Sequence, residues 1–314
     1  MSYWGINALN HGSSIALFSG SKFKLITSAD NQLDHSDIRY ALEYYGAPDR
    51  IFWYEQPWLK KARQLYAGQY KTAFTLSSLP TQYLKQLRLD YAPITCTPHH
   101  ASHAAAGYYT SPFNHCAVVV LDAIGEFESA TIWHARHGEM KKVWSRSYPH
   151  SLGLFYSAFT KLIGLTPIQD EYLLQQMSDQ GDPMRYYWDV KNYMDGVVHA
   201  GKNMHRGIQD WPHTINNLSD QCDIAAAVQT VFIEQVHGVM KKAKQLTGAD
   251  SLVYMGGCAM NRKANQTVVE PKFKHIWSLP DPGDASSSIG AVLYHTQQRL
   301  DHQWDPVKHI AITV

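Results

Sequence analysis

The chain has 314 residues, which is enough for one large domain or two lobes around a well-buried core. Hydrophobic residues make up 45% of the chain and charged residues 18%, so a disordered protein is excluded. The formal net charge is +1, from 28 basic and 27 acidic residues, and it gives no global attraction to nucleic acid or membrane.

The first third of the chain predicts strands followed by helices. A β-hairpin is expected near the N-terminus, with its turn at Ser-Gly-Ser 19–21. A helix with a polar start then ends at Gly46, with Pro48 just beyond it. The segment 50–55 predicts a short strand, and 101–109 a helix.

The rest of the chain alternates between helices and strands. A strand is expected at 117–121, and a second strand follows the loop after it. Further strands are expected at 251–255 and 275–280, and helices at 151–164, 223–248 and in the last part of 281–300. Residues 166–220 are poorly periodic, and we interpret them as a partly ordered insertion or a long functional loop region. Two strands end in loops, "LDAIGE" and "YMGGCAMN", at the position where α/β sheets bind ligands.

Cysteine spacing and hydropathy indicate the compartment. The four cysteines form no CxxC pair, which favours free thiols in a reducing compartment. The N-terminus lacks the pattern of a signal peptide, and no apolar run approaches about 18 residues. We therefore expect a soluble cytoplasmic protein with no membrane contact.

The stretch "PHHASHAAAGYY" holds a candidate metal site. His99 and His103 are four positions apart and share one face of the expected helix, so both rings can reach one ion. Asp284, just before the last helix, would complete a set of two histidines and one carboxylate that suits a divalent transition metal. Ordinary surface histidines and a helix-capping aspartate explain the same residues equally simply.

The two loops are candidate ligand sites with simpler alternatives. The Gly-Gly turn at 256–257 would let backbone N–H groups face a phosphate, but it is also an ordinary tight turn. The first loop offers Asp122, Gly125 and Glu126, and it also fits a plain β-turn. His11, after the first strand, either faces the same cleft or is a polar loop residue.

A basic and aromatic segment spans residues 50–90. It contains seven Lys or Arg residues against two acids, interleaved with aromatic side chains. Such a mixture suits phosphate contacts and base stacking. A solvated helix with an aromatic core face is the alternative.

Taken together, these stretches resemble the O-carbamoyltransferase family, which includes nodulation-factor and antibiotic-tailoring enzymes. Its catalytic lobe is related to proteins that transfer threonylcarbamoyl to tRNA. The resemblance runs from residue 5 to 294, in the family's order, and rests on "GINALNHGSSIAL", "HHASHAAAGYYTSPF", "AVVVLDAIGEFESATIW", "SYPHSLGLFYSAFTKLIG", "DEY", "GGCAMNRKAN" and "PDPGDASSSIGAVLY".

The resemblance implies an α/β, actin-like fold of two lobes, with mixed sheets flanked by helices. We place the N-terminal lobe, with the HxxxH helix, at 1–150, and the C-terminal lobe, with the nucleotide-binding loop and the 166–220 insertion, at 151–314. The implied metal ligands are His99, His103 and Asp284. The residues implied to hold a nucleotide or donor are Asp122, Gly125, Glu126, Gly256, Gly257 and Asn261. His11 and His150 match positions that face the reaction centre.

The implied activity is metal-dependent transfer of a carbamoyl group from carbamoyl phosphate to an acceptor hydroxyl, directly or through carbamoyl-adenylate made with ATP. Iron is the leading metal, with zinc, manganese or magnesium as alternatives. The family's full-length members carry a YrdC-like domain that makes the adenylate, and we expect this chain to lack it. That work is then done in trans, or carbamoyl phosphate is used directly, or the step does not take place.

The acceptor is predicted from the 50–90 segment, which makes the chain similar to virus-encoded enzymes that modify hydroxymethylated pyrimidines, in the host cytoplasm. The leading acceptor is 5-hydroxymethylcytosine in DNA. The candidate acceptor-binding residues are His100, Arg50, Lys60, Lys61 and Trp58. A sugar or small-molecule hydroxyl is the first alternative, and a non-catalytic nucleotide-binding subunit of an actin-like complex is the second. The sequence leaves the oligomeric state open.

Overall fold

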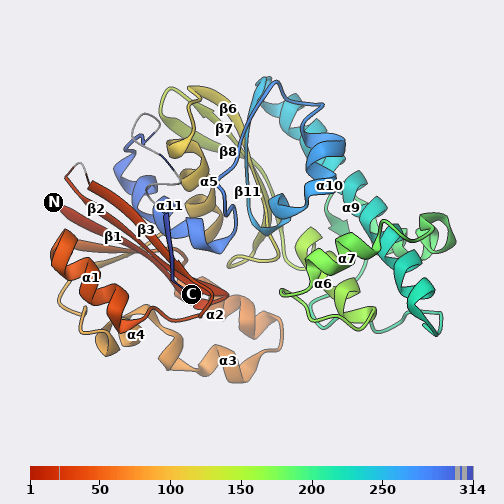
Figure 1. Cartoon of the computed structure of the whole chain (residues 1–314), viewed down its shortest axis with the longest axis horizontal. Helices are drawn as coiled ribbons and strands as arrows, with labels where there is room; N and C mark the ends of the chain where they lie inside the picture. The colour runs from red at the N-terminus through yellow and green to blue at the C-terminus, as the bar shows by residue number, and fades with distance from the viewer. Residues whose placement is uncertain (21, 301–304, 306–309, 314) are drawn as a thin grey trace.

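The computed structural model describes residues 1–20, 22–300, 305 and 310–313. Its first sheet is built mainly from the N-terminal part of the chain (Figure 1). An antiparallel meander of three strands comes first, and two further strands pair parallel to β1 and to each other on its other side. The spatial order is β13 (Ile310–Thr313), β3 (Lys22–Ser28), β2 (Gly12–Ser19), β1 (Ser2–Asn10), β4 (Arg50–Trp53) and β5 (Ile94–Cys96).

The second sheet repeats this topology. A meander of three antiparallel strands is again followed by two strands that add, in parallel, beside the first of the three. The order is β12 (His275–Trp277), β11 (Ser251–Met255), β6 (His115–Leu121), β7 (Glu128–Arg136) and β8 (Glu139–Ser147). This duplication is the architecture of the actin-like two-lobed fold, so the predicted fold class is confirmed.

The sheets divide the chain earlier than the sequence predicted. Strands β6, β7 and β8 were assigned to the first lobe, within residues 1–150, but they pair with β11 and β12. The division between the sheets therefore falls at α5 (His99–Thr110), which connects β5 to β6. The sequence pattern of a strand or a turn does not show which sheet the segment joins. The sequence therefore could not locate this division.

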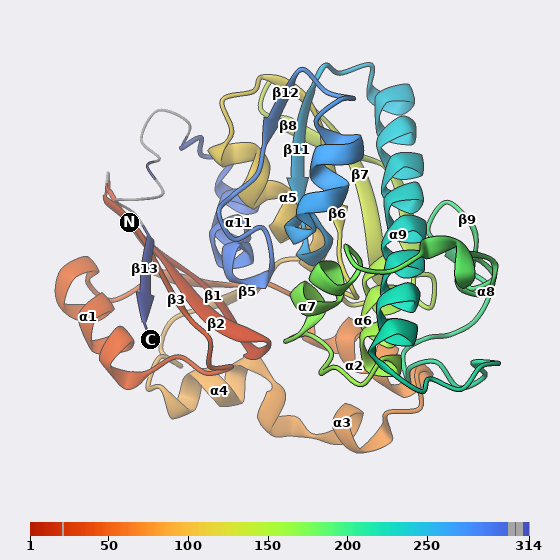
Figure 2. The same ribbon diagram turned by 45° about the vertical axis from the view of Figure 1, so that its right-hand side comes forward.

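Two helices pack against each other between the sheets (Figures 1 and 2). α5 contacts β6, β7 and β11 of the second sheet, while α11 (Asp284–Thr296) contacts β1, β2 and β4 of the first. Glycine allows the close crossing, because a Cβ on Gly290 of α11 would lie 1.7 Å from the carbonyl oxygen of Ser102 in α5. The crossing fixes the N-terminal ends of α5 and α11 relative to each other.

Replacing Gly290 by alanine is expected to destabilise the protein strongly. The new methyl group overlaps backbone that cannot move without separating the two helices, so the free energy of unfolding should fall by about 3 kcal/mol or more. Urea denaturation followed by circular dichroism measures this. Gly201→Ala is the control, because a Cβ there would meet its nearest atom, the Asn192 carbonyl oxygen, at 3.5 Å. Equal midpoints for the two variants would contradict the close crossing.

The remaining helices lie outside the two sheets (Figures 1 and 2). The first lobe carries α1 (His35–Tyr45), α2 (Pro57–Tyr66), α3 (Tyr70–Phe74) and α4 (Pro80–Gln86). The second carries α6 (Leu152–Leu162), α9 (Leu218–Thr247) and α10 (Arg262–Ala264). Gly46 and Gly248 end α1 and α9 as predicted, Gly248 in the left-handed conformation. No helix in the described part of the chain combines the length and apolarity that a membrane span needs.

Residues 166–220 are built into the second lobe. They form α7 (Glu171–Met177), α8 (Tyr187–Lys191) and the short strands β9 (Met194–Gly196) and β10 (His199–Ala200). Some of their apolar side chains, among them Leu174, Val190 and Val198, are fully buried in the core of that lobe, whereas Met184 and Trp188 are exposed. Elements this short show no periodicity in a sequence that is mostly polar, and residues 201–217 form no helix or strand.

Candidate metal centre

The N-terminus of α5 is held by a buried carboxylate. Pro98, the residue before the helix, offers no side-chain cap. The Glu126 carboxylate takes that role by accepting a hydrogen bond from the His99 N–H at 3.0 Å and another from the Gln56 N–H at 2.6 Å. A negative charge is favourable at a helix N-terminus. Glu126 therefore fixes the first turn of α5, from which His99 projects.

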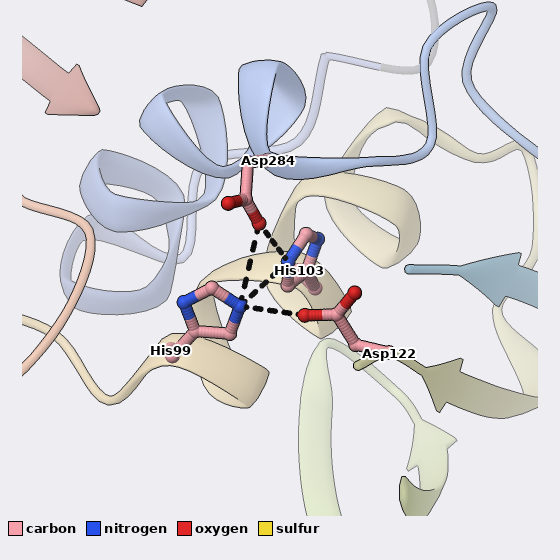
Figure 3. A group of neighbouring side chains, drawn as sticks. All are labelled: His99, His103, Asp122 and Asp284. Atoms are coloured by element: carbon pink, nitrogen blue, oxygen red, sulfur yellow. Dashed lines mark hydrogen bonds and ion pairs between the residues drawn. The ribbon is translucent and has the colours of Figure 1, made fainter. Parts of the chain in front are cut away.

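Four side chains meet where α5, α11 and the end of β6 come together (Figure 3). Their candidate ligand atoms, from His99, His103, Asp122 and Asp284, all lie within 4.8 Å of one another. His99 Nε2 is 3.1 Å from His103 Nε2 and 3.1 Å from Asp122 Oδ2. His103 Nε2 is 3.2 Å from Asp284 Oδ1. The three predicted ligands are thus together, and Asp122 joins them as a fourth.

The donor set fits a divalent transition metal. Two Nε2 atoms that face each other at 3.1 Å can be satisfied by one shared proton or by one shared cation. Two imidazoles and two carboxylates suit iron, zinc or manganese. Both histidine rings are buried. The outer carboxylate oxygens are also oriented, because Asn10 Nδ2 donates to Asp284 Oδ2 at 3.0 Å and Gly257 N–H donates to Asp122 Oδ1 at 3.3 Å.

The charges of the cluster compensate one another. Burial disfavours the charged form of His99, but the carboxylates of Asp284 and Asp122 outweigh it and raise the pKa of His99 to about 9. Burial likewise opposes the charges of Asp122 and Asp284, yet the neighbouring histidines lower the pKa of both carboxyls. One proton on His99 thus offsets part of the negative charge, which is the role that a bound cation would take.

The glycines of the two loops shape this cluster. Gly256 has a φ of 91°, and a Cβ on it would lie 2.2 Å from the Leu121 carbonyl oxygen, so the turn closes tightly on the end of β6. A Cβ on Gly125 would lie 3.1 Å from the His99 Cβ. Gly256, Gly257 and Gly125 therefore stand beside the candidate ligands, where they were predicted to face a donor.

Two of the residues predicted to hold the donor cap helices instead. Glu126 holds the start of α5, as described above. Asn261 Oδ1 accepts from the Ala264 N–H at 3.0 Å, and its amide also pairs with that of Gln229. These contacts use the polar atoms that donor binding would need.

The two histidines predicted to face the reaction centre lie in different settings. His11 is exposed in the turn after β1, next to Asn10, whose amide contacts Asp284. His150 Nδ1 lies 3.1 Å from the Ala200 carbonyl oxygen, which can accept but not donate, so Nδ1 carries the hydrogen. The Nε2 of neutral His150 therefore keeps its lone pair.

The residues predicted to bind the acceptor do not converge. Arg50 pairs with Tyr3 in the sheet, at the end away from Asn10. His100 is fully buried, and its Nδ1 lies 3.1 Å from Thr131 Oγ1. Both residues are thus excluded from a common acceptor surface.

The predicted lysines are occupied as well. Lys60 forms an ion pair with Glu55 at 2.8 Å. Lys61 is buried, and its Nζ donates to the carbonyl oxygens of Ala73 and Thr75 at 3.0 and 2.6 Å. Trp58 is exposed. Lys60 and Lys61 therefore contribute little to a basic surface, whereas Lys71, Lys85 and Arg88 of the same segment are exposed.

Sequence reasoning missed two features of the site. Asp122 was assigned to the donor and not to the metal, although its position at the end of a buried strand was a signal. Arg63 is buried beside the site, where its Nε donates to the Glu126 carbonyl oxygen at 3.2 Å and its Nη1 to Gln69 Oε1 at 3.1 Å. No sequence pattern separated it from the other cations of the 50–90 segment.

Known proteins are similar in sequence to most of this chain. Protein sll1178 of Synechocystis sp. is 31% identical over 239 residues, which cover 68% of this chain and 38% of that protein. Nodulation protein NolNO of Sinorhizobium fredii is 26% identical over 287 residues, 84% of this chain and 42% of that protein. The chain therefore spans about two fifths of the length of these curated relatives.

A solved structure and a family model also match. Component A of (R)-2-hydroxyglutaryl-CoA dehydratase from Acidaminococcus fermentans is similar, with a TM-score of 0.49 and 10% identity, over 95% of this chain and 99% of that one. The model described as carbamoyltransferase N-terminus matches residues 28–293, which include all four residues of the cluster. The chain thus belongs to the family of carbamoyltransferase N-terminal domains, as the sequence motifs predicted.

Proposed function

We propose that the chain catalyses metal-dependent O-carbamoyl transfer from carbamoyl phosphate, directly or through carbamoyl-adenylate, to an acceptor hydroxyl. One observation carries the proposal: His99, His103, Asp122 and Asp284 converge within 4.8 Å inside a carbamoyltransferase domain. A scaffold that merely bound a nucleotide would have no need of four converging ligands, two of them buried histidines. The alternative of a non-catalytic subunit is therefore disfavoured.

The reaction forms a bond between the acceptor oxygen and the carbamoyl carbon and breaks the bond from that carbon to the phosphate oxygen. A divalent cation at the four ligands would supply Lewis-acid polarisation of the donor. The hydroxyl proton goes to a histidine, and His150 Nε2 or the exposed His11 would accept it.

We propose 5-hydroxymethylcytosine in DNA as the acceptor. The support comes from exposed aromatic side chains more than from the basic residues of the 50–90 segment. The basic residues named above are largely occupied, but four aromatic side chains remain exposed along α2 and α3. They are Trp58, Tyr66, Tyr70 and Phe74, at 67%, 73%, 64% and 71% exposure. Exposed aromatic rings favour stacking with unpaired bases. The matching relative named as a nodulation protein keeps a small-molecule hydroxyl as the second candidate.

The test is a transfer assay read by mass spectrometry. The purified protein is incubated with carbamoyl phosphate, with and without ATP, and with four acceptors: an oligonucleotide containing hydroxymethylcytosine, its cytosine counterpart, a nucleoside panel and an aminoglycoside panel. We expect a single carbamoyl adduct on the hydroxymethylcytosine oligonucleotide and none on the cytosine control. An adduct confined to the small molecules would contradict the DNA acceptor. No adduct on any acceptor would contradict the transfer itself.

A further inference from the structure

The two lobes touch at a second polar cluster, where α2 meets residues 203–207. Gln69, just after α2, contacts His205 with 3.1 Å between Gln69 Nε2 and His205 Nε2. On the second lobe, Asn203 Nδ2 donates to the Tyr148 hydroxyl at 2.8 Å, and the Tyr148 ring packs edge-on against both His205 and Tyr66. This contact is separate from the four-ligand cluster.

Hydrogen bonding determines which ring nitrogen of neutral His205 carries the hydrogen. Gln69 Oε1 accepts from Arg63 Nη1 at 3.1 Å, so the other end of the amide, Nε2, must donate to His205 Nε2. The hydrogen of neutral His205 is then on Nδ1, which is buried and has no hydrogen-bond partner in the described part of the chain. Burial, with the charges of Arg63 and Arg206, lowers the pKa of His205 and keeps the ring neutral.

Two guanidinium groups lie close to His205, because Arg63 shares Gln69 with it and Arg206 is the next residue in the chain. Arg63 is 6% exposed, and Arg206 reaches across the lobe contact, its Nη2 lying 3.2 Å from where a Cβ on Gly68 would stand. Neither forms an ion pair within 4.0 Å of a carboxylate among the described residues. The nearest acids that act on Arg63 are Glu55, which is paired with Lys60, and Glu126, which caps α5.

We propose that Arg63, His205 and Arg206 form a binding site for a phosphate group at this contact between the lobes. Guanidinium groups recognise phosphate through charge-assisted hydrogen bonds, and an imidazole N–H without an acceptor supplies a further donor. The site is linked to the four-ligand cluster, because Arg63 donates to the Glu126 carbonyl while the Glu126 carboxylate holds the His99 N–H.

The phosphate has two sources that share this chemistry. It is the phosphate of the donor or a phosphodiester of a DNA acceptor. The choice between them rests on the proposed function, whereas binding of phosphate itself does not. The exposed Tyr66 and Tyr70 next to the site would stack bases in the second case.

The test measures affinity for three probes in the full chain. Inorganic phosphate and carbamoyl phosphate are titrated by calorimetry, and a labelled single-stranded oligonucleotide by fluorescence anisotropy. Arg206→Gln removes the exposed guanidinium. Arg63→Lys keeps the positive charge but loses the paired N–H donors of the guanidinium. Lys241→Gln, an exposed lysine toward the far end of α9, is the matched loss of one charge.

We expect Arg206→Gln and Arg63→Lys to weaken phosphate binding by about 10-fold, with Lys241→Gln within about 2-fold of wild type. If the two arginine variants also bind carbamoyl phosphate more weakly but bind the oligonucleotide as the wild type does, the phosphate is that of the donor. If they also bind the oligonucleotide more weakly, the phosphate is that of DNA. Absence of saturable binding by the wild type would overturn the proposal. So would an Arg206→Gln protein that melts at lower temperature with unchanged affinity, because Arg206 would then stabilise only the C-terminal end of α2. These results stand even if no carbamoyl transfer is detected, so the two proposals fail separately.

Discussion

Replacement of His103 by alanine is expected to abolish metal binding and carbamoyl transfer together. His103 Nε2 lies 3.1 Å from His99 Nε2 and 3.2 Å from Asp284 Oδ1, within the group of four ligands. Loss of a single outer-sphere partner already costs about 10- to 100-fold in metal affinity, and loss of a ligand should exceed that. Metal content by mass spectrometry and the transfer assay on the same preparation measure both effects.

The control for this variant is a second histidine pair. His115, which is exposed, and His134, which is half-buried, lie on neighbouring strands with their Nε2 atoms 2.9 Å apart. His115→Ala breaks a pair that would also attract metal adventitiously, so it should leave stoichiometric metal and activity unchanged. If His115→Ala loses the metal while His103→Ala keeps it, the four-ligand cluster is not the metal site.

Replacement of Asp122 by asparagine is expected to lower metal affinity by about 10-fold or more while the fold is retained. The amide has nearly the shape of the carboxylate but loses its charge, and Asp122 Oδ2 lies 3.1 Å from His99 Nε2. Binding of zinc or manganese by calorimetry measures the effect. The thermal midpoint reports on folding.

Asp281→Asn provides the matched control for Asp122→Asn. Burial raises the pKa of Asp281, and its Oδ1 accepts from the Gly283 N–H at 3.0 Å, close to Asp284 but outside the ligand set. This variant should bind metal as the wild type does. An Asp122→Asn protein with unchanged metal affinity and a raised KM for carbamoyl phosphate would instead assign Asp122 to the donor, as the sequence analysis did.

Three of the four candidate ligands were predictable because local geometry brings their side chains together. His99 and His103 are one helical turn apart, and Asp284 opens a helix, so the sequence gives both their direction and their kind. The position of Asp122 depends on how α5 crosses α11 and on the turn at Gly256. This turn, which follows β11, brings the Gly257 N–H to Asp122 Oδ1. Contacts between segments so far apart in the chain leave no local pattern.

The places of the predicted acceptor residues were hard to predict for a related reason. Seven cations in residues 50–90 suggested a basic face, but Lys61 is directed inward onto backbone carbonyls and Lys60 onto Glu55. The number of charged residues in a segment does not reveal which side chains already have hydrogen-bond or ion-pair partners. Conversely, the contact between Gln69 and His205 joins residues 136 positions apart, and no feature of either sequence stretch predicted it.

The central claim is that carbamoyl transfer depends on a metal held by His99, His103, Asp122 and Asp284. The most direct test removes the metal with a chelator, measures transfer of labelled carbamoyl from carbamoyl phosphate, and then restores iron, zinc or manganese in separate samples. We predict that transfer is lost on chelation and returns with at least one of these metals in the wild type but not in His103→Ala. Transfer that persists in protein shown to be free of metal would contradict the account.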